Sequence, residues 1–542
     1  MASARRLRVL EHHLTNAKAP AGSDTHIHKV TSAEEAVQCI RDGSVITVAG
    51  FVGTGLPEAL VNAVRARFDA SGHPCNLHLY AVAAVGDGKG RGMCKLAVEG
   101  LVTKFTYGWA GLSPAYAKLI QQGKIAAWNL PLGVVSHLFR EVAAKRPGPI
   151  TPVGLATFVD PREQGGKVTS PQQPDAVQLI SVGGRELLWY PSPASVDVAI
   201  LRGTTADLDG NISFEREPFY ADQLYQAMAV HNSGGTVLVQ VLRVVQRGCI
   251  PSRLVHLPGC FVDKVVIAPP ELHWQSLATP AHEGWLCGEM YAHSQQSPDM
   301  DLSERRIIAH RALLEIRASN AIINLGVGMP EGVARMVATH ARRDNPGCLP
   351  VTLTTEVGVV GGFPAGGLRF GAAANPAAVM PCASMIDFYQ GGGADTACLG
   401  MGEVDEHGNV NVSRFEGRMP GCGGFIDISS TAKQVLFLGT FTSGGLKISV
   451  RGGKLHIERE GRIRKFRRKV LEKTFAAASS RGRPIRYITE RAVFQLTEGT
   501  SGTLELLEIA PGVDLQKDIL EEMDFRPLTK AVKIMDTRCF AL

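Results

Sequence analysis

Short apolar runs that end at glycine-rich turns divide the chain into alternating strands and helices. Residues 44–49 and 321–324 are apolar and rich in β-branched side chains. Each run leads through a Gly-x-Gly turn into a segment with helical patterning, at 58–67 and at 331–338. Short runs without regular polar alternation are typical of strands that are buried in a parallel sheet. The pattern predicts an α/β fold.

Two motifs recur in the same order along the chain. The Gly-x-Gly-x-Pro-Glu turn that contains Pro57 returns with Pro330, at an offset of 273 (330 − 57). The Asp-x-x-Gly-Asn motif that contains Gly210 returns with Gly408, at an offset of 198 (408 − 210). This period is far longer than a solenoid repeat. We therefore predict two related open α/β domains, duplicated and fused.

The spacing of these motifs also predicts the domain bounds. A weakly ordered extension at 1–28 is expected to precede a first domain at 29–280, and a polar, proline-containing linker at 281–302 leads to a second domain at 303–542. The first domain has 75 extra residues between its landmarks (273 − 198). We assign part of this excess to residues 157–193, which are expected to be rich in strands.

Composition places the chain among ordinary globular proteins. A chain of 542 residues is too long for one core, and 45% hydrophobic with 20% charged residues is typical of soluble domains. The eleven cysteines include no Cys-x-x-Cys pair, which favours a reducing compartment over a disulfide framework. No apolar run reaches the length of a membrane span. We expect a cytoplasmic protein that does not enter the membrane.

Charge and histidine patterns indicate neither nucleic acid nor a metal. The net charge is +6, and the densest basic run, at 462–469, directly follows Glu458 and Glu460, as on a solvated surface. His26 and His28 form a His-x-His pair, but no apolar strand precedes it, so the metal signal is weak. We predict no nucleic-acid partner and no metal site.

The glycine-rich turns do not match the usual nucleotide-binding motifs. A Gly-x-Gly turn at the start of a helix favours an anion, because its free N–H groups point at the ligand. A dinucleotide motif needs a third glycine, which Pro57 and Pro330 replace. Residues 165–169 come nearest to a P-loop but lack its leading glycine. No Gly-x-Ser-x-Gly elbow occurs either. We predict neither ATP nor a nicotinamide cofactor.

One carboxylate lies in a setting that suits chemistry. The predicted strand 351–355 ends at Glu356, and five of the ten residues in 358–367 are glycine. Ligands of open α/β sheets bind beyond the carboxyl ends of the strands. From the residues alone two interpretations stay open: Glu356 caps a following helix, or it acts as a general base or nucleophile.

Two further features suit stabilisation of an oxyanion. The glycine-rich segment 421–424 offers main-chain N–H groups, and Asn324 offers a side-chain amide at the end of its strand. A plain loop and a satisfied polar side chain explain the same residues. The residues alone leave both alternatives open.

Several segments, in order, resemble the landmarks of family I coenzyme A transferases. The resemblance is closest to the single-chain acetate/propionate CoA-transferases, in which two subunits are fused, and it extends from about residue 30 to the C-terminus. Val357 departs from the pattern, because relatives often have Ser, Ala or Asn there. The matching segments are 50–60, 324–331, 356–367, 408–415, 421–426 and 440–447.

This resemblance implies a set of site residues. It implies Glu356 as the nucleophile, and the side chain of Asn324 with the main-chain N–H of Gly424 as oxyanion donors. The glycines that it implies for contact with coenzyme A are Gly326, Gly328, Gly361, Gly362, Gly366, Gly367 and Gly423.

The resemblance also implies the reaction. Coenzyme A is expected to pass between a propionyl-, acetyl- or butyryl-like acyl-CoA and a free short-chain carboxylate, by a ping-pong route through a glutamyl-CoA thioester. Coenzyme A is then a co-substrate, and no other cofactor is expected. A homo-oligomer, either dimer or tetramer, is expected as well. The alternatives are an acyl-CoA hydrolase on the same fold and a non-catalytic sensor that binds the ligand.

Overall fold

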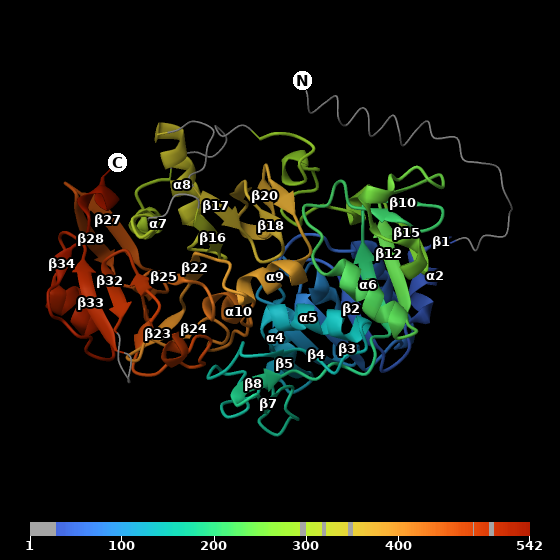
Figure 1. Ribbon diagram of the computed structural model, residues 1–542, viewed down its shortest axis with the longest axis horizontal. Helices are drawn as coiled ribbons and strands as arrows, with labels where there is room; N and C mark the ends of the chain where they lie inside the picture. The colour runs from blue at the N-terminus through green and yellow to red at the C-terminus, as the bar shows by residue number, and fades with distance from the viewer. Residues whose placement is uncertain are drawn as a thin grey trace.

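The computed structural model describes residues 29–292, 300–316, 321–344, 351–480, 482–497 and 503–541. The extension predicted at 1–28 lies outside the described residues. Two large sheets lie at opposite sides of the molecule (Figure 1). Each sheet takes its strands from one side of residues 281–302, and the predicted domain bounds remain a prediction.

The first sheet has eight strands, and all of its neighbouring strands run parallel. Both of its faces are covered, which explains the continuous apolar runs. In β9, for example, Ala199 and Leu201 belong to one core cluster, whereas Val198 and Ile200 belong to another. The strand order is β1 (Val30–Thr31), β15 (Lys264–Ile267), β12 (Thr236–Val241), β9 (Val198–Arg202), β2 (Val45–Val48), β3 (Leu77–Ala83), β4 (Val102–Trp109) and β5 (Ala126–Asn129).

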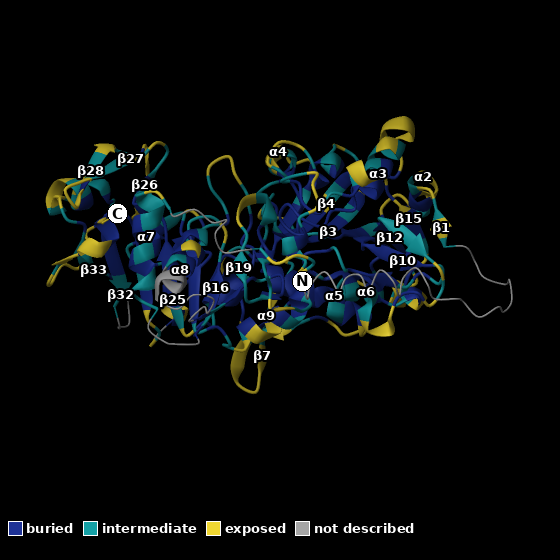
Figure 2. Ribbon diagram, turned by 90° about the horizontal axis from the view of Figure 1, so that it is seen from above, coloured by how far each residue is buried: buried dark blue, intermediate teal, exposed yellow. Residues whose placement is uncertain are grey.

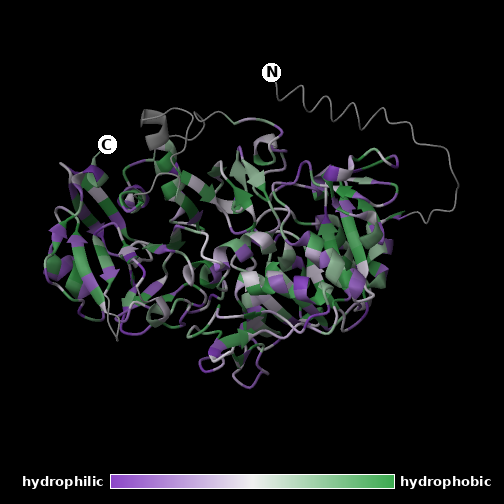
Figure 3. Ribbon diagram, viewed as in Figure 1, coloured by the Kyte–Doolittle hydropathy of each residue, from purple (hydrophilic) through white to green (hydrophobic). Residues whose placement is uncertain are grey.

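The second sheet has ten strands with a parallel centre. Antiparallel pairs extend it on both sides. Apolar residues dominate the strands of both sheets (Figure 3). The strand order is β21 (Ala378–Val379), β18 (Val359–Val360), β17 (Val351–Thr354), β16 (Ala321–Leu325), β22 (Thr396–Gly400), β25 (Gln434–Leu438), β31 (Ile485–Ile488), β32 (Ala492–Leu496), β33 (Leu504–Ile509) and β34 (Lys533–Ile534).

The two copies of each repeated motif adopt the same local structure. Strand β2 leads into α3 (Glu58–Ser71), and β16 leads into α8 (Glu331–Asp344), so both motif glutamates begin a helix. Asp207 accepts the side-chain amide of Asn211 at 3.0 Å, and Asp405 accepts that of Asn409 at 3.0 Å. The predicted fold class, two related α/β halves, is confirmed.

The predicted strand-rich segment at 157–193 is only partly correct. It contains β7 (Gln178–Val182) and β8 (Arg185–Trp189), which form a protruding hairpin with exposed residues (Figure 2). The residues before β7 form successive turns instead. The buried carboxylate of Asp160 accepts the main-chain N–H groups of Ala156 and Arg162 at 2.9 and 3.0 Å, which replaces the pairing that a strand would supply.

The halves meet in the middle of the molecule, where α5 (Leu132–Ala143) contacts α9 (Cys382–Gln390) and α10 (Phe425–Ser429) (Figure 1). The loop before α10 also lies along the first sheet. Gly423 donates its N–H to the Gly108 carbonyl at 2.9 Å and accepts the Leu132 N–H at 2.9 Å. A loop of the second half is thereby fixed at the carboxyl ends of strands in the first half.

Among the described helices, none is both long enough and apolar enough to cross a lipid bilayer.

Candidate active site

Glu356 lies immediately beyond strand β17, at its carboxyl end. No helix follows it; the chain turns at Gly358 and pairs back through β18. The interpretation of Glu356 as a helix cap is therefore wrong, because β-hairpin pairing continues the chain. The residue is half-buried. It occupies the position in an open α/β sheet where ligands bind.

The Glu356 carboxylate lies against Gly424, and the main-chain N–H of Gly424 acts to lower the pKa of that carboxyl group. Gly424 also lies so close to Glu356 that a Cβ atom at this position would overlap Oε2 of the carboxylate. Only glycine leaves this contact open. The structure thus brings together two of the three residues predicted for catalysis, from segments that are far apart in the sequence.

The environment makes Glu356 an unusually basic carboxyl group. Burial raises its pKa, and the negative charge of Asp427 raises it further, against the opposing hydrogen bond from Gly424. The pKa rises from 4.5 to about 7. Strongly perturbed acids of this kind concentrate at functional sites. With a pKa of about 7, Glu356 is a mixture of carboxylate and carboxylic acid at neutral pH.

Asn324 lies on the strand next to that of Glu356. In the parallel pair β16–β17 it is opposite Thr354, two residues before the glutamate. The buried amide donates from Nδ2 to the Tyr389 hydroxyl at 3.1 Å, and Tyr389 donates to Thr354 at 2.8 Å. Its Oδ1 has no hydrogen-bond partner among the described residues. One N–H of the amide is thus anchored, and a role toward an oxyanion rests on the second.

The glycines predicted to contact coenzyme A do not form one group. Gly326 and Gly328 belong to the turn before α8, and the exposed Gly366 lies against the Glu331 side chain at the start of that helix. Gly367 is its neighbour, with a φ of 62°.

The other predicted glycines lie elsewhere. Gly361 and Gly362 have φ values of 75° and 70° and turn the chain after β18. Gly423 lies against the Trp109 side chain. Their predicted contact with coenzyme A stays a prediction.

Sequence reasoning missed two buried acids where the two halves meet. Asp427 and Asp222 are both fully buried, and burial raises the pKa of each to about 6. Cys382 is buried as well and donates from Sγ to the Glu356 carbonyl at 3.4 Å. Asp427 directly follows the matching segment 421–426, and that adjacency was the available signal.

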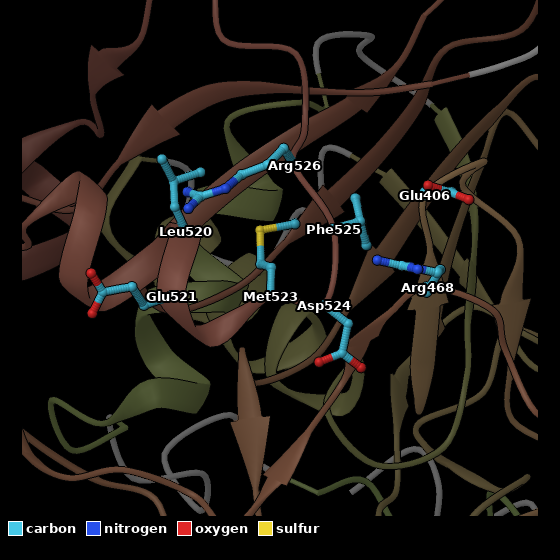
Figure 4. Close-up of a pocket in the computed structure, with 8 residues that line it drawn as sticks. All are labelled: Glu406, Arg468, Leu520, Glu521, Met523, Asp524, Phe525 and Arg526. Carbon is cyan, nitrogen blue, oxygen red and sulfur yellow. The ribbon is translucent and has the colours of Figure 1, made fainter.

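The described surface also carries a hollow and two sets of potential metal ligands, and none of them includes a residue named above for the site around Glu356. A hollow of about 630 Å³ in the second half carries both signs of charge (Figure 4). Two sets of potential metal ligands also occur at the surface: Asp42, His73 and Cys75, and His282, Cys287 and Glu289. The hollow is lined by Glu406, Arg468, Leu520, Glu521, Met523, Asp524, Phe525 and Arg526.

Sequence comparison relates the chain to enzymes that act on coenzyme A esters. The sequence model described as coenzyme A transferase matches residues 30–268. Acetate CoA-transferase YdiF of Escherichia coli K12 is 42% identical over 516 residues, covering 94% of this chain and 95% of that protein. Caffeate CoA-transferase of Acetobacterium woodii is 42% identical over 522 residues, covering 95% and 97%.

Structural comparison agrees. The crystal structure of the YdiF apoenzyme from Escherichia coli O157:H7 matches with a TM-score of 0.88 at 40% identity, covering 96% of this chain and 98% of that one. A second YdiF structure, a thioester complex with CoA, matches with a TM-score of 0.87 at 40% identity, covering 95% and 96%.

Proposed function

Because the chain belongs to the coenzyme A transferase family, we propose that it transfers coenzyme A from a short-chain acyl-CoA to a free short-chain carboxylate, through a covalent thioester on Glu356. The observation that carries this proposal is the close approach of the Glu356 carboxylate to Gly424. The thioester complex of the related YdiF with CoA supports it.

The first half-reaction forms the covalent enzyme. The Glu356 carboxylate attacks the carbonyl carbon of the acyl-CoA, and the C–S bond breaks to give an acyl-glutamyl anhydride and the CoA thiolate. The thiolate then attacks the γ-carbonyl of Glu356, which releases the free acid and leaves glutamyl-CoA thioester. The second half-reaction reverses these steps with another acid. One thioester replaces another, so no external energy source or further cofactor is required.

The surroundings of Glu356 suit each step. Every attack creates an oxyanion, and the N–H of Gly424 and the amide of Asn324 are the proposed donors to it. A carboxylate is a weak nucleophile toward a thioester. Its raised pKa, caused by burial and by Asp427, strengthens it.

The relatives indicate which acids to test. Acetate, propionate and butyrate follow from the resemblance to short-chain transferases. A second class is favoured by the caffeate CoA-transferase, whose identity to this chain equals that of the acetate enzyme. Transfer assays with short aliphatic acids and with caffeate, from acetyl-CoA as donor, decide between the two classes.

Mass spectrometry after incubation with acetyl-CoA and no acceptor tests the mechanism. We expect a CoA adduct on the peptide that contains Glu356, removable by hydroxylamine and absent from Glu356→Gln. Cys382→Ala is the matched control, because it removes the thiol that contacts the Glu356 carbonyl and must keep the adduct. An adduct on a cysteine contradicts the proposal. CoA release at full rate without acceptor favours the hydrolase alternative.

The remaining expectations also stand as proposals. We propose a cytoplasmic homo-oligomer, a dimer or tetramer, that acts on small molecules without nucleic acid, membrane or metal. Light scattering coupled to size-exclusion chromatography tests the assembly.

A further inference from the structure

Asp427 connects three elements at the junction of the two halves. Its side chain is fully buried in α10. It accepts the main-chain N–H of Gly133 in α5 at 2.9 Å and the side-chain amide of Gln390 in α9 at 2.8 Å. Within the described residues Asp427 forms no ion pair with Lys or Arg. Burying a carboxylate that is held only by neutral donors costs folding free energy. We therefore expect Asp427 to have a role besides packing.

The anchoring of Asp427 determines where Gly424 lies. Gly424 caps the short helix that contains Asp427, and the Ile428 N–H bonds to the Gly424 carbonyl at 3.0 Å. Gly133 has no room for a Cβ atom, because Asp427 and Ile386 fill that space. The Asp427–Gly133 bond therefore holds α10 tightly on α5. A shift of α10 would carry the Gly424 N–H away from the Glu356 carboxylate.

Other charged and titratable groups near Asp427 and Glu356 come from the helices that pack against α10. From α5, His137 lowers the pKa of Asp427, against the larger effect of burial. From α9, Cys382 contacts the main chain of Glu356, and Asp387 pairs with Arg140.

The remaining groups do not add a charge beside Glu356. Asp222 bonds to Ser136, and Tyr389 bonds to Thr354. Of all these groups, Asp427 is the acid whose charge acts on the Glu356 carboxyl group. Glu356 and Asp427 thus both lie at α10, the first against its cap residue Gly424 and the second in its first turn.

We propose that Asp427 is a positioning residue of the transfer reaction: it fixes the Gly424 N–H on Glu356, and its negative charge makes the Glu356 carboxylate a stronger nucleophile. This inference rests on the proposed function of Glu356. It predicts that the acid is required for its charge as well as for its hydrogen bonds.

Asp427→Asn separates charge from structure. The amide keeps the shape of the carboxylate, and its oxygen still accepts the Gly133 N–H. Its new NH₂ group then faces Gln390, whose side-chain amide regains a hydrogen bond by turning over, because a glutamine amide has a donor end and an acceptor end. The variant is thus expected to fold while the negative charge is lost.

The test is the pH dependence of single-turnover adduct formation on Glu356 with acetyl-CoA, between pH 5.5 and 9. The wild-type rate should rise with pH through about 7, the pKa of Glu356. In Asp427→Asn the rise should move to lower pH, because the ionised form of Glu356 is no longer repelled. The plateau rate should fall roughly tenfold, because a less basic carboxylate is a weaker nucleophile.

Asp222→Asn is the matched control. It also removes a buried carboxylate of raised pKa, but one that does not act on Glu356. In Asp222→Asn the rate of adduct formation should rise over the same pH range as in the wild type. An unshifted rise in Asp427→Asn overturns the inference, even if the plateau falls. Absence of any adduct in the wild type instead refutes the proposed function, so the two failures are distinguishable.

Discussion

Oε2 of Glu356 occupies the space that a Cβ atom would need at Gly424. The main-chain N–H of Gly424 acts to lower the pKa of the same carboxyl group. The contact therefore depends on the absence of one methyl group. It joins the end of β17 to the start of α10, and both α9 and β22 lie between these two elements along the chain.

Gly424→Ala should abolish most of the transfer activity without unfolding the protein. The added methyl group displaces the carboxylate, so that the Gly424 N–H no longer points at it. Loss of one such donor lowers the rate about 100- to 1,000-fold. Steady-state transfer kinetics and circular dichroism measure both effects. Gly400→Ala at the end of β22 is the control, because the nearest atom to its Cβ would lie at 3.8 Å. Near-wild-type activity in Gly424→Ala contradicts the assignment.

Asn324→Ala should lower the transfer rate roughly 100-fold if its free N–H serves the oxyanion. Tyr389→Phe separates this role from the anchoring of the amide, since it removes the hydroxyl that accepts from Asn324 at 3.1 Å and donates to Thr354 at 2.8 Å. We expect Tyr389→Phe to lower the rate less than Asn324→Ala, with both variants folded. Equal losses in the two variants would mean that the amide acts through its anchor rather than on the substrate.

Glu356→Gln should be more stable than the wild type above neutral pH. The pKa of Glu356 is about 7 in the folded protein against an ordinary value of 4.5. Between these values the folded state holds the proton more tightly, so the wild type loses stability as pH rises from about 4.5 to 7. Glutamine has no such dependence. Thermal unfolding at pH 5 and at pH 8 should show a melting-temperature difference that grows with pH; a constant difference contradicts the raised pKa.

Glu217→Gln should destabilise the first half through Arg202. Both side chains are buried and form a salt bridge at 2.9 Å, and Arg202 also donates to the Leu56 carbonyl at 3.1 Å. Breaking a buried pair costs about 3–5 kcal/mol. Urea unfolding measures the loss, and Lys433→Met, which breaks an exposed pair with Asp395, should cost less than about 1 kcal/mol.

The same pair predicts an acid dependence. Although burial alone raises the pKa of Glu217, the Arg202 guanidinium holds it at about 2. The unfolded carboxyl group takes up a proton at a higher pH than the folded one. The stabilisation is therefore complete above pH 4.5 and is lost as pH falls toward 2. The stability gap between the wild type and Glu217→Gln should narrow over this range, and a gap that stays constant contradicts the lowered pKa.

Much of the architecture was predictable because it depends on local sequence patterns. Apolar runs, Gly-x-Gly turns and the repeated motifs around Pro57 and Pro330 depend on neighbouring residues, and the structure confirms two related α/β halves. Prediction was poorer at 157–177, where turns depend on the buried carboxylate of Asp160 rather than on periodicity. A side-chain hydrogen bond of this kind leaves no repeat in the sequence.

Local patterns were enough to predict that Glu356 follows a strand and precedes glycines, and that Asn324 lies at the end of another strand. Tertiary packing alone brings Gly424 to Glu356, places the Tyr389 hydroxyl on the Asn324 amide, and lets the charge of Asp427 raise the pKa of Glu356. The difference comes from distance along the chain. Strand and turn preferences act over a few residues, whereas the contact that raises the pKa of Glu356 forms only when α10 packs on α5 across the two halves.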